Sequence, residues 1–193
     1  NKLTAIIPTF NEESNIDAVI SSVSFADEII IVDSFSTDNT LNIAKKYDVR
    51  IIQRNYKNSA SQKNWAIPQA THNWILIIDA DERVPKKLKN EIIYTLKETK
   101  GNYGFWIRRE NYFMGKKIKF SGWQNDKVIR LFTKNFRYEN KSVHAEVITN
   151  GKNKMLKNKI IHYTFKSYSH YKNKINQYAI WQAEDFIKTK TNI

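Results

Sequence analysis

Short runs of apolar residues alternate with stretches of helical periodicity through the first hundred residues of the chain. Runs of four to six aliphatic residues that end near Pro, Asp or Gln are typical of buried strands. Apolar side chains at helical spacing, such as Ile16, Val19, Ile20 and Val23, are typical of helices that pack on a sheet. The expected strands are residues 3–7, 28–33, 49–53 and 74–78, and the expected helices are residues 12–23, 36–44 and 61–70. This alternation predicts an α/β unit with a doubly wound sheet.

The second half of the chain has a weaker pattern. Its expected elements are a strand at residues 101–110, a hairpin at 111–120, a basic loop at 152–159 and a long helix at 167–188. The helix carries an aromatic and aliphatic stripe beside lysines, which suits either the headgroup region of a membrane or packing across the sheet. The sequence leaves both interpretations open.

Length and composition bound the class of protein. The chain has 193 residues, of which 41% are apolar and 26% charged, enough for one core of ordinary size. No apolar run approaches the ~20 residues that cross a bilayer, and no cleavable apolar segment follows Asn1, so neither a membrane-spanning helix nor a signal peptide is expected. The absence of cysteine excludes disulfides, thiolate metal sites and a cysteine nucleophile, and it fits a cytoplasmic protein.

Charge is unevenly distributed. Residues 1–100 carry 13 Lys and Arg against 13 Asp and Glu, whereas residues 101–193 carry 19 against 6, so the net charge of +13 belongs to the second half. An anionic partner such as phosphate-bearing lipid or nucleic acid would explain this, and so would a solvated surface rich in lysine.

The ends of the expected strands carry the candidate chemistry. All five glycines lie after residue 100, which excludes a Walker loop or a dinucleotide fingerprint from the first half. In an open α/β sheet, ligands bind outside the carboxyl ends of the strands, and here those ends are followed by Glu12, Asp33, Asp79 and Asp81. A turn or cap would explain any one of these residues. Two carboxylates at i and i+2, however, suit a divalent cation that takes oxygen ligands and bridges diphosphate oxygens.

Several segments in a fixed order carry a resemblance. In the first half they are Ile6-Ile7-Pro8-Thr9-Phe10-Asn11-Glu12, Ile29-Ile30-Ile31-Val32-Asp33-Ser34 followed by Ser36-Thr37-Asp38-Asn39-Thr40, Gln62-Lys63-Asn64 and Ile78-Asp79-Ala80-Asp81-Glu82. In the second half they are Asn111-Tyr112-Phe113-Met114-Gly115, Gly122-Trp123, Asp126, Arg130-Leu131-Phe132 and Val143-His144. Over most of residues 3–165 the chain resembles inverting family 2 glycosyltransferases, and within them the small bacterial enzymes that extend the lipopolysaccharide core. The resemblance implies a single α/β domain of GT-A type with a doubly wound mixed sheet, in which a nucleotide-binding half (1–100) precedes an acceptor-binding half (101–193).

The resemblance also implies a donor site, for which we expect a nucleotide sugar and specifically a UDP-sugar. The residues expected to bind it are Pro8, Thr9, Asn11, Glu12, Asp33, Ser34, Lys63, Asp79 and Ala80. Among them Asp33 matches the carboxylate that recognises the base or ribose, and Lys63 matches a basic residue near the diphosphate, although a helical lysine can equally be solvated. Asp81 matches the metal-binding aspartate, with Asp79 supporting the ribose or the metal. The expected cofactor is Mg²⁺ or Mn²⁺, which would stabilise the departing nucleoside diphosphate.

On the acceptor side, inversion needs a base opposite the leaving group. Asp126 matches the family's acceptor-side carboxylate, which is followed four residues later by Arg, here Arg130; an ion pair with Lys127 or Arg130 is the structural alternative. Trp123 could stack under an acceptor sugar or belong to the core. His144 resembles a family histidine near the metal or diphosphate, and a core histidine is equally compatible with the sequence.

The expected partners are the nucleotide-sugar donor, a glycan or lipid-linked acceptor, and an anionic membrane surface at the inner face of the cell membrane. Two other classes compete with this interpretation. A phosphohydrolase of the haloacid dehalogenase type also has paired aspartates, but such enzymes have Thr or Val two residues after the second aspartate, where this chain has Arg83. A non-catalytic nucleic-acid-binding module would use the basic second half but leaves the strand-end carboxylates without a purpose, since they repel phosphates. Nucleic acid is therefore not expected as a partner.

Overall fold

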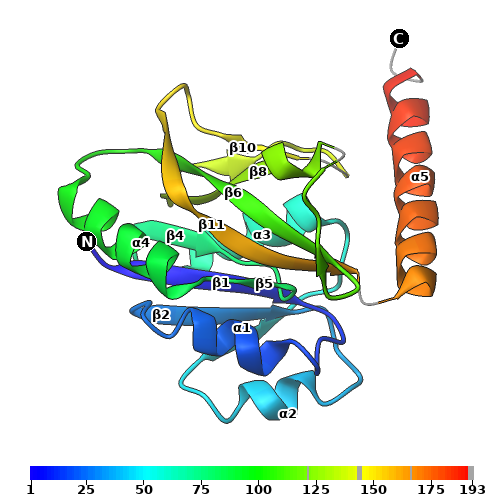
Figure 1. Ribbon diagram of the computed structural model, residues 1–193, viewed down its shortest axis with the longest axis horizontal. Helices are drawn as coiled ribbons and strands as arrows, with labels where there is room; N and C mark the ends of the chain where they lie inside the picture. The colour runs from blue at the N-terminus through cyan, green and yellow to red at the C-terminus, as the bar shows by residue number, and fades with distance from the viewer. Residues whose placement is uncertain (121, 143–144, 166, 191–193) are drawn as a thin grey trace.

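Four parallel strands form one side of a continuous mixed sheet (Figure 1). The structure is a computed structural model that describes residues 1–120, 122–142, 145–165 and 167–190. The central strands are buried on both faces, because aliphatic residues occupy successive positions along them. The four parallel strands are β1 (Leu3–Thr9), β2 (Glu28–Asp33), β3 (Arg50–Gln53) and β4 (Trp74–Ile77).

Strands from the second half extend the same sheet beyond β4, in the order β3-β2-β1-β4-β8-β6-β11-β5. These strands are β6 (Gly104–Phe113), β7 (Lys116–Lys117), β8 (Lys127–Thr133) and β11 (Asn153–Phe165), and β5 (Glu82–Arg83) of the first half joins them. β9 (Arg137–Tyr138) pairs separately with β10 (Val147–Ile148). β5 follows β4 directly in the chain yet pairs with β11 at the far edge. Only residues 78–81 connect β4 to β5, so the carboxyl end of β4 lies close to β11.

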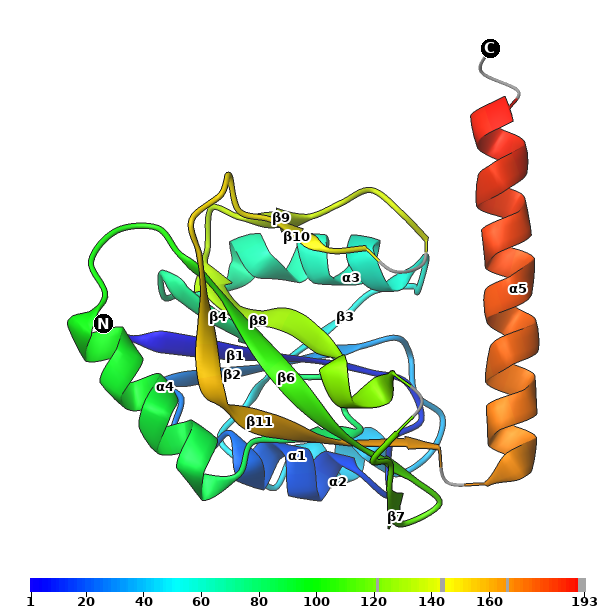
Figure 2. The ribbon, with the colours of Figure 1, turned by 45° about the horizontal axis from the view of Figure 1, so that its top comes forward.

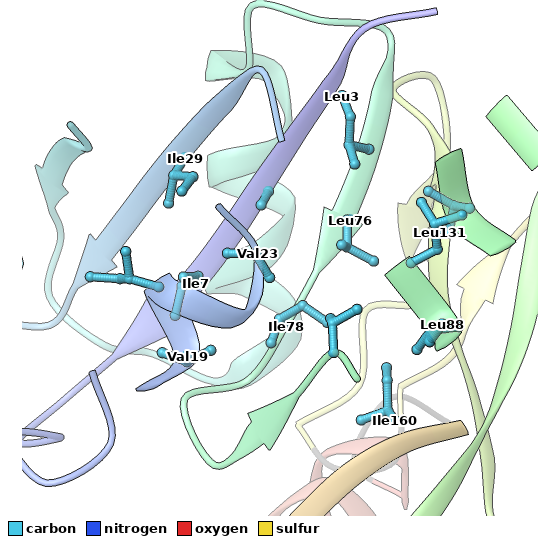
Figure 3. Close-up of a cluster of buried hydrophobic side chains, with 14 of the residues drawn as sticks. Leu3, Ile7, Val19, Val23, Ile29, Leu76, Ile78, Leu88, Leu131 and Ile160 are labelled. Atoms are coloured by element: carbon cyan, nitrogen blue, oxygen red, sulfur yellow. The ribbon is translucent and has the colours of Figure 1, made fainter. Parts of the chain in front are cut away.

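Helices cover both faces of the sheet (Figure 2). On one face α1 (Ile16–Ser22), α2 (Thr40–Ala44) and α4 (Lys86–Glu98) pack on the core cluster of Figure 3, in which aliphatic residues of the helices interlock with those of β1, β4, β8 and β11. On the other face α3 (Ser59–Ala66), which continues into the 3₁₀ helix η1 (Ile67–Gln69), packs on a second cluster. Apolar contacts on both faces hold the strand ends that carry the candidate site.

The helix expected at residues 12–23 begins only at Ile16. The backbone N–H groups of Asn11, Glu12 and Glu13, which precede the helix, donate to side chains of the neighbouring loop. Their acceptors are the oxygens of Ser36, Thr40 and Asp38. The loops after β1 and β2 are thus fastened to each other, which fixes the rim of the sheet.

The prediction of a basic loop at residues 152–159 is wrong, because residues 153–159 belong to β11. Leu156 and Ile160 are buried while the lysines around them are exposed, and a register shift between Met155 and Lys159 breaks the simple alternation that would have indicated a strand. The carboxylate of Glu91 on α4 accepts hydrogen bonds from the backbone of this irregular stretch. α4 itself, with its buried residues at spacing four, was not among the expected elements.

The long helix expected at residues 167–188 is α5 (Tyr168–Lys190), and it does not pack across the sheet. In both views it stands beside the body of the protein and approaches it at its first turns (Figures 1 and 2). Its contacts include Tyr171 against Phe165, with ring centroids 5.0 Å apart, and Trp181 against Tyr56 at 6.3 Å. Among the described helices, none has the length and hydropathy to cross a bilayer.

Candidate functional site

A cavity of about 1040 Å³ lies where the carboxyl ends of β1 and β4 face β8, β11 and the start of α5. First-half residues that line it include Pro8, Glu12, Lys63, Asp79, Ala80 and Asp81. Second-half residues that line it include Trp123, Asp126, Arg130 and His162. The cavity therefore gathers most of the expected donor residues with the expected acceptor residues.

The remaining expected donor residues, Thr9, Asn11, Asp33 and Ser34, do not line the cavity. Asp33 is fully buried and accepts hydrogen bonds from the N–H and hydroxyl of Ser36 and from Gln53 Nε2. The Thr9 hydroxyl lies 3.5 Å from Asp33 Oδ1, and Asn11 Oδ1 accepts from the Thr37 N–H at 2.8 Å. In this arrangement these side chains organise the rim loops, and the role of Asp33 and Ser34 toward a nucleotide stays a prediction.

Two buried cations hold Asp79. Lys63 Nζ lies 2.9 Å from Asp79 Oδ1, and the guanidinium of Arg130 is hydrogen-bonded to Asp79 Oδ2. Lys63 is 5% exposed, because α3 packs its base against the sheet and points the amine into the site, so it is not a solvated surface lysine. Burial alone would raise the pKa of Asp79, but the charges of Arg130 and Lys63 hold this pKa well below its usual range. Asp79 is therefore an ionised residue with both oxygens engaged.

Asp81 faces a histidine that was not among the expected site residues. His162 on β11 has its Nδ1 2.7 Å from Asn111 Oδ1 and its Nε2 3.5 Å from Asp81 Oδ2. Because the Asn111 amide NH₂ donates to Asp126, its oxygen accepts from His162, which places the imidazole hydrogen on Nδ1. The other ring nitrogen, Nε2, then faces the Asp81 carboxylate.

This donor set fits a divalent metal. An imidazole nitrogen fixed by a hydrogen bond at its other nitrogen, beside an ionised carboxylate, is a common metal-binding pair. Burial would raise the pKa of Asp81, but His162 and Lys174 lower it, so the carboxylate is available as a ligand. Among the described residues there is no cluster of three or more His, Cys, Asp or Glu side chains placed to hold a metal. The chain would thus offer two ligands, Asp81 and His162.

A chain of alternating charges joins the two sides of the site. Glu82 is fully buried; it accepts from Arg130 Nη2 at 2.8 Å and lies 3.7 Å from Arg109 Nη1. Arg109 in turn makes two hydrogen bonds of 2.8 Å with the carboxylate of Asp126. The order of groups is Lys63, Asp79, Arg130, Glu82, Arg109 and Asp126. Each buried charge has a neighbour of opposite sign, which is the condition under which such charges are tolerated away from water.

Asp126 lies on the wall of the cavity, between the 3₁₀ helix η2 (Trp123–Asn125) and β8. Its ion-pair partner is Arg109, not the Lys127 or Arg130 that the sequence suggested. Burial would raise its pKa, but the hydrogen bonds and charge of Arg109 and the amide of Asn111 bring that pKa below the usual value. Asp126 is thus ionised at neutral pH and held in a fixed orientation.

The other expected acceptor residues have different outcomes. Trp123 is half-buried, lines the cavity and stacks near Phe165, with centroids 6.4 Å apart, so it is not a core residue. Arg130 lines the cavity and forms an ion pair with Asp79. His144 lies outside the described residues. His162 could have been recognised only by pairing residue 162 with the β5 strand beside Asp81, a pairing that no local pattern predicts.

Comparison with known protein families and curated proteins gives consistent matches. The model of glycosyl transferase family 2 matches residues 4–165. An uncharacterized glycosyltransferase of Rickettsia typhi is 32% identical over 209 residues, which cover 97% of this chain and 68% of that protein. The lipopolysaccharide core biosynthesis glycosyltransferase LpsC of Rhizobium meliloti is 30% identical over 156 residues, which cover 77% of this chain and 58% of that protein.

Comparison with solved structures also finds similar proteins. The crystal structure of Staphylococcus aureus TarS 1–349 with UDP-GlcNAc matches with a TM-score of 0.51 and 26% identity, over 63% of this chain and 38% of that chain. TarS 1–349 with UDP matches with a TM-score of 0.63 at 18% identity, over 85% and 61%, a likeness of fold alone. This chain thus spans less than two thirds of the solved chains that it resembles. The comparisons give no support to a nucleic-acid-binding module.

Proposed function

The chain belongs to glycosyl transferase family 2 and has the expected GT-A type fold, and on that premise we propose that it moves a sugar from a nucleotide-sugar donor to a hydroxyl of a glycan or glycolipid acceptor, with inversion. One observation carries the proposal. The Asp79-Ala80-Asp81 segment of the first half and Asp126 of the second half line one cavity, although 45 residues separate Asp81 from Asp126 in the chain. A donor diphosphate and an acceptor hydroxyl can therefore meet there.

The proposed donor is a UDP-sugar. Supporting this choice, TarS, to which this chain is similar, was crystallised with UDP-GlcNAc. Pro8, Glu12 and Lys63 border the donor side of the cavity, and Lys63 is a cation that could approach the diphosphate from α3. Asp79 keeps the buried Lys63 and Arg130 in place, so that positive charge faces the donor without being free to move.

Asp81 and His162 are the residues that would hold Mg²⁺ or Mn²⁺. The bound cation would neutralise charge on the departing nucleoside diphosphate. Asp79, which was also expected near the metal, has both oxygens occupied by Lys63 and Arg130, so in this proposal it positions those two cations.

Asp126 is the proposed base. Its carboxylate would accept the proton of the attacking acceptor hydroxyl while Arg109 and Asn111 fix its orientation. Trp123 offers an apolar ring face beside it for an acceptor sugar. Preorganised charge of this kind lowers the barrier because the groups need not reorient as the reaction proceeds.

The similarity to LpsC supports an acceptor from the lipopolysaccharide core or another surface polysaccharide. Such acceptors are attached to lipid, which fits the basic second half of the chain. We place the protein in the cytoplasm and at the inner face of the membrane, where nucleotide sugars and lipid-linked acceptors meet.

A thermal-shift panel tests the donor side. Nucleotide sugars with different bases, each with Mn²⁺ or Mg²⁺, should single out one class that raises Tm. A ligand at 100 times its Kd stabilises by about 2.7 kcal/mol, or roughly 5–10 °C for a chain of this size. UDP-sugars are expected to give this shift and GDP-sugars to give none. The proposed donor site would be contradicted if no nucleotide sugar raised Tm, or if the rise were the same with and without the cation.

A further inference from the structure

Met114, at the tip of the β6–β7 hairpin, is an unusual residue for the backbone conformation found there. Met114 and Gly115 both have positive φ, 49° and 77°, as in the type I′ turn that joins two antiparallel strands. Asn, Asp and Gly are favoured at the first of these positions, whereas Met is disfavoured. The Met114 side chain is also 52% exposed, so it does not serve the core. Local structure and solubility would both favour another residue here.

Other exposed apolar side chains lie close to this tip. Phe120, on the chain that leaves the hairpin, is 76% exposed, and Tyr168 at the start of α5 is 67% exposed. The hairpin and α5 are joined beneath them by rings: Phe113 and Tyr171 have centroids 5.5 Å apart, and Tyr168 and Tyr171 6.2 Å. The hairpin and the first turns of α5 therefore lie side by side (Figure 2).

Positive charge surrounds these apolar groups. Residues 111–120 contain three lysines and no acid. Lys117 pairs with Glu110, while Lys116 and Lys119 are exposed and have no carboxylate within ion-pair distance among the described residues. We call Met114, Lys116, Lys119, Phe120 and Tyr168 the hairpin surface. Apolar tips flanked by lysines match the boundary between the headgroups and acyl chains of an anionic bilayer.

The hairpin surface adjoins the mouth of the site. Trp123, Phe165 and Tyr171 line the cavity and belong to the same ring cluster as Phe113. At the base of the hairpin, Asn111 donates to Asp126. A membrane in contact with the hairpin would thus lie next to the acceptor side of the cavity.

We propose that the hairpin surface docks the protein on an anionic membrane, with Met114 and Phe120 entering the interface and Lys116 and Lys119 contacting lipid phosphates. Membrane contact rests on this surface alone. Delivery of a lipid-linked acceptor to Asp126 from that membrane rests in addition on the proposed function.

The test is co-sedimentation with phosphatidylcholine vesicles that do or do not contain phosphatidylglycerol. Met114→Asn is the informative variant, because Asn suits the turn better than Met and the fold should be kept. It is expected to lower partitioning onto the anionic vesicles roughly five- to tenfold through loss of apolar burial. Lys116→Gln with Lys119→Gln should lower it about 30-fold at low salt, which corresponds to about 1 kcal/mol per lysine. Matched controls on the remote helix α4 and just after it, Tyr94→Asn and Lys97→Gln with Lys100→Gln, should bind as the unchanged protein does.

Equal vesicle binding by the hairpin and control variants would overturn the proposal, as would failure of the unchanged protein to bind anionic vesicles. Self-association that Met114→Asn abolishes, without vesicle binding, would show that the surface is an interface between copies and would also overturn it. Nucleotide-sugar binding by Met114→Asn should equal that of the unchanged protein. A variant that binds the donor but no longer binds vesicles therefore tests the hairpin surface alone. Failure of the unchanged protein to bind any nucleotide sugar would count against the proposed function and not against the hairpin surface.

Discussion

Asp126→Asn is expected to lower the rate of sugar transfer by about 10²–10⁴-fold, the usual contribution of a positioned general base. Asn keeps the shape of the side chain and can still accept from Arg109, but it cannot take the proton of an acceptor hydroxyl. Nucleotide-sugar affinity should stay nearly unchanged, because the lost interaction belongs to the transition state. The measurement is turnover with saturating donor, together with donor affinity by calorimetry.

The stability of Asp126→Asn has to be measured together with its activity. The pKa of Asp126 is lower in the folded protein than its usual value, so its ionised form contributes stability above that value and loses the contribution as pH falls. Asp126→Asn is therefore somewhat less stable at neutral pH, and turnover should be measured well below its Tm. Glu139→Gln, at a partly exposed carboxylate paired with Lys141, is the matched control and should keep full activity. Near-normal transfer by Asp126→Asn would make Asp126 a structural ion-pair residue and Glu146, which also lines the cavity, the next candidate base.

Asp81→Ala is expected to abolish turnover and to remove the metal-dependent part of the affinity for nucleoside diphosphate. The reason is that His162 alone would remain to hold the cation. Titration of UDP in the presence of Mn²⁺ should show the loss, and a chelator added to the unchanged protein should reproduce it.

A control separates this loss from unfolding. Asp48→Ala removes an exposed carboxylate in the turn before β3 and should bind UDP with Mn²⁺ as the unchanged protein does. Binding of UDP by Asp81→Ala that equals the unchanged protein and resists the chelator would rule out Asp81 as the metal ligand.

The sequence predicted the parallel strands well because their side chains are apolar on both faces and leave continuous runs such as Glu28–Asp33. It failed at β11, where exposed lysines and a register shift hide the alternation and where Glu91 of a distant helix satisfies the irregular backbone. The start of α1 was misplaced for a related reason: the residues just before it are hydrogen-bonded to side chains of another loop, a contact that no local pattern indicates. Local patterns predict elements only where local contacts determine them.

The residues of the site likewise fall into those that local sequence could predict and those that it could not. Asp79, Asp81 and Asp126 could be selected from motifs, and all three line the cavity. His162 and Arg109 could not, because they reach the site only through the pairing of β11 with β5 and of β6 with β8. Their positions depend on strand order, which no short segment of the sequence contains.

The most direct test of the account is the anomeric configuration of the product. The protein would be incubated with Mn²⁺, an α-linked UDP-sugar and a deacylated lipopolysaccharide core oligosaccharide, and the new linkage read by NMR. Inverting transfer through Asp126 predicts release of UDP with formation of a β-linkage, absent in Asp126→Asn. An α-linked product, or UDP-sugar binding without transfer to any core or surface-polysaccharide acceptor, would contradict it.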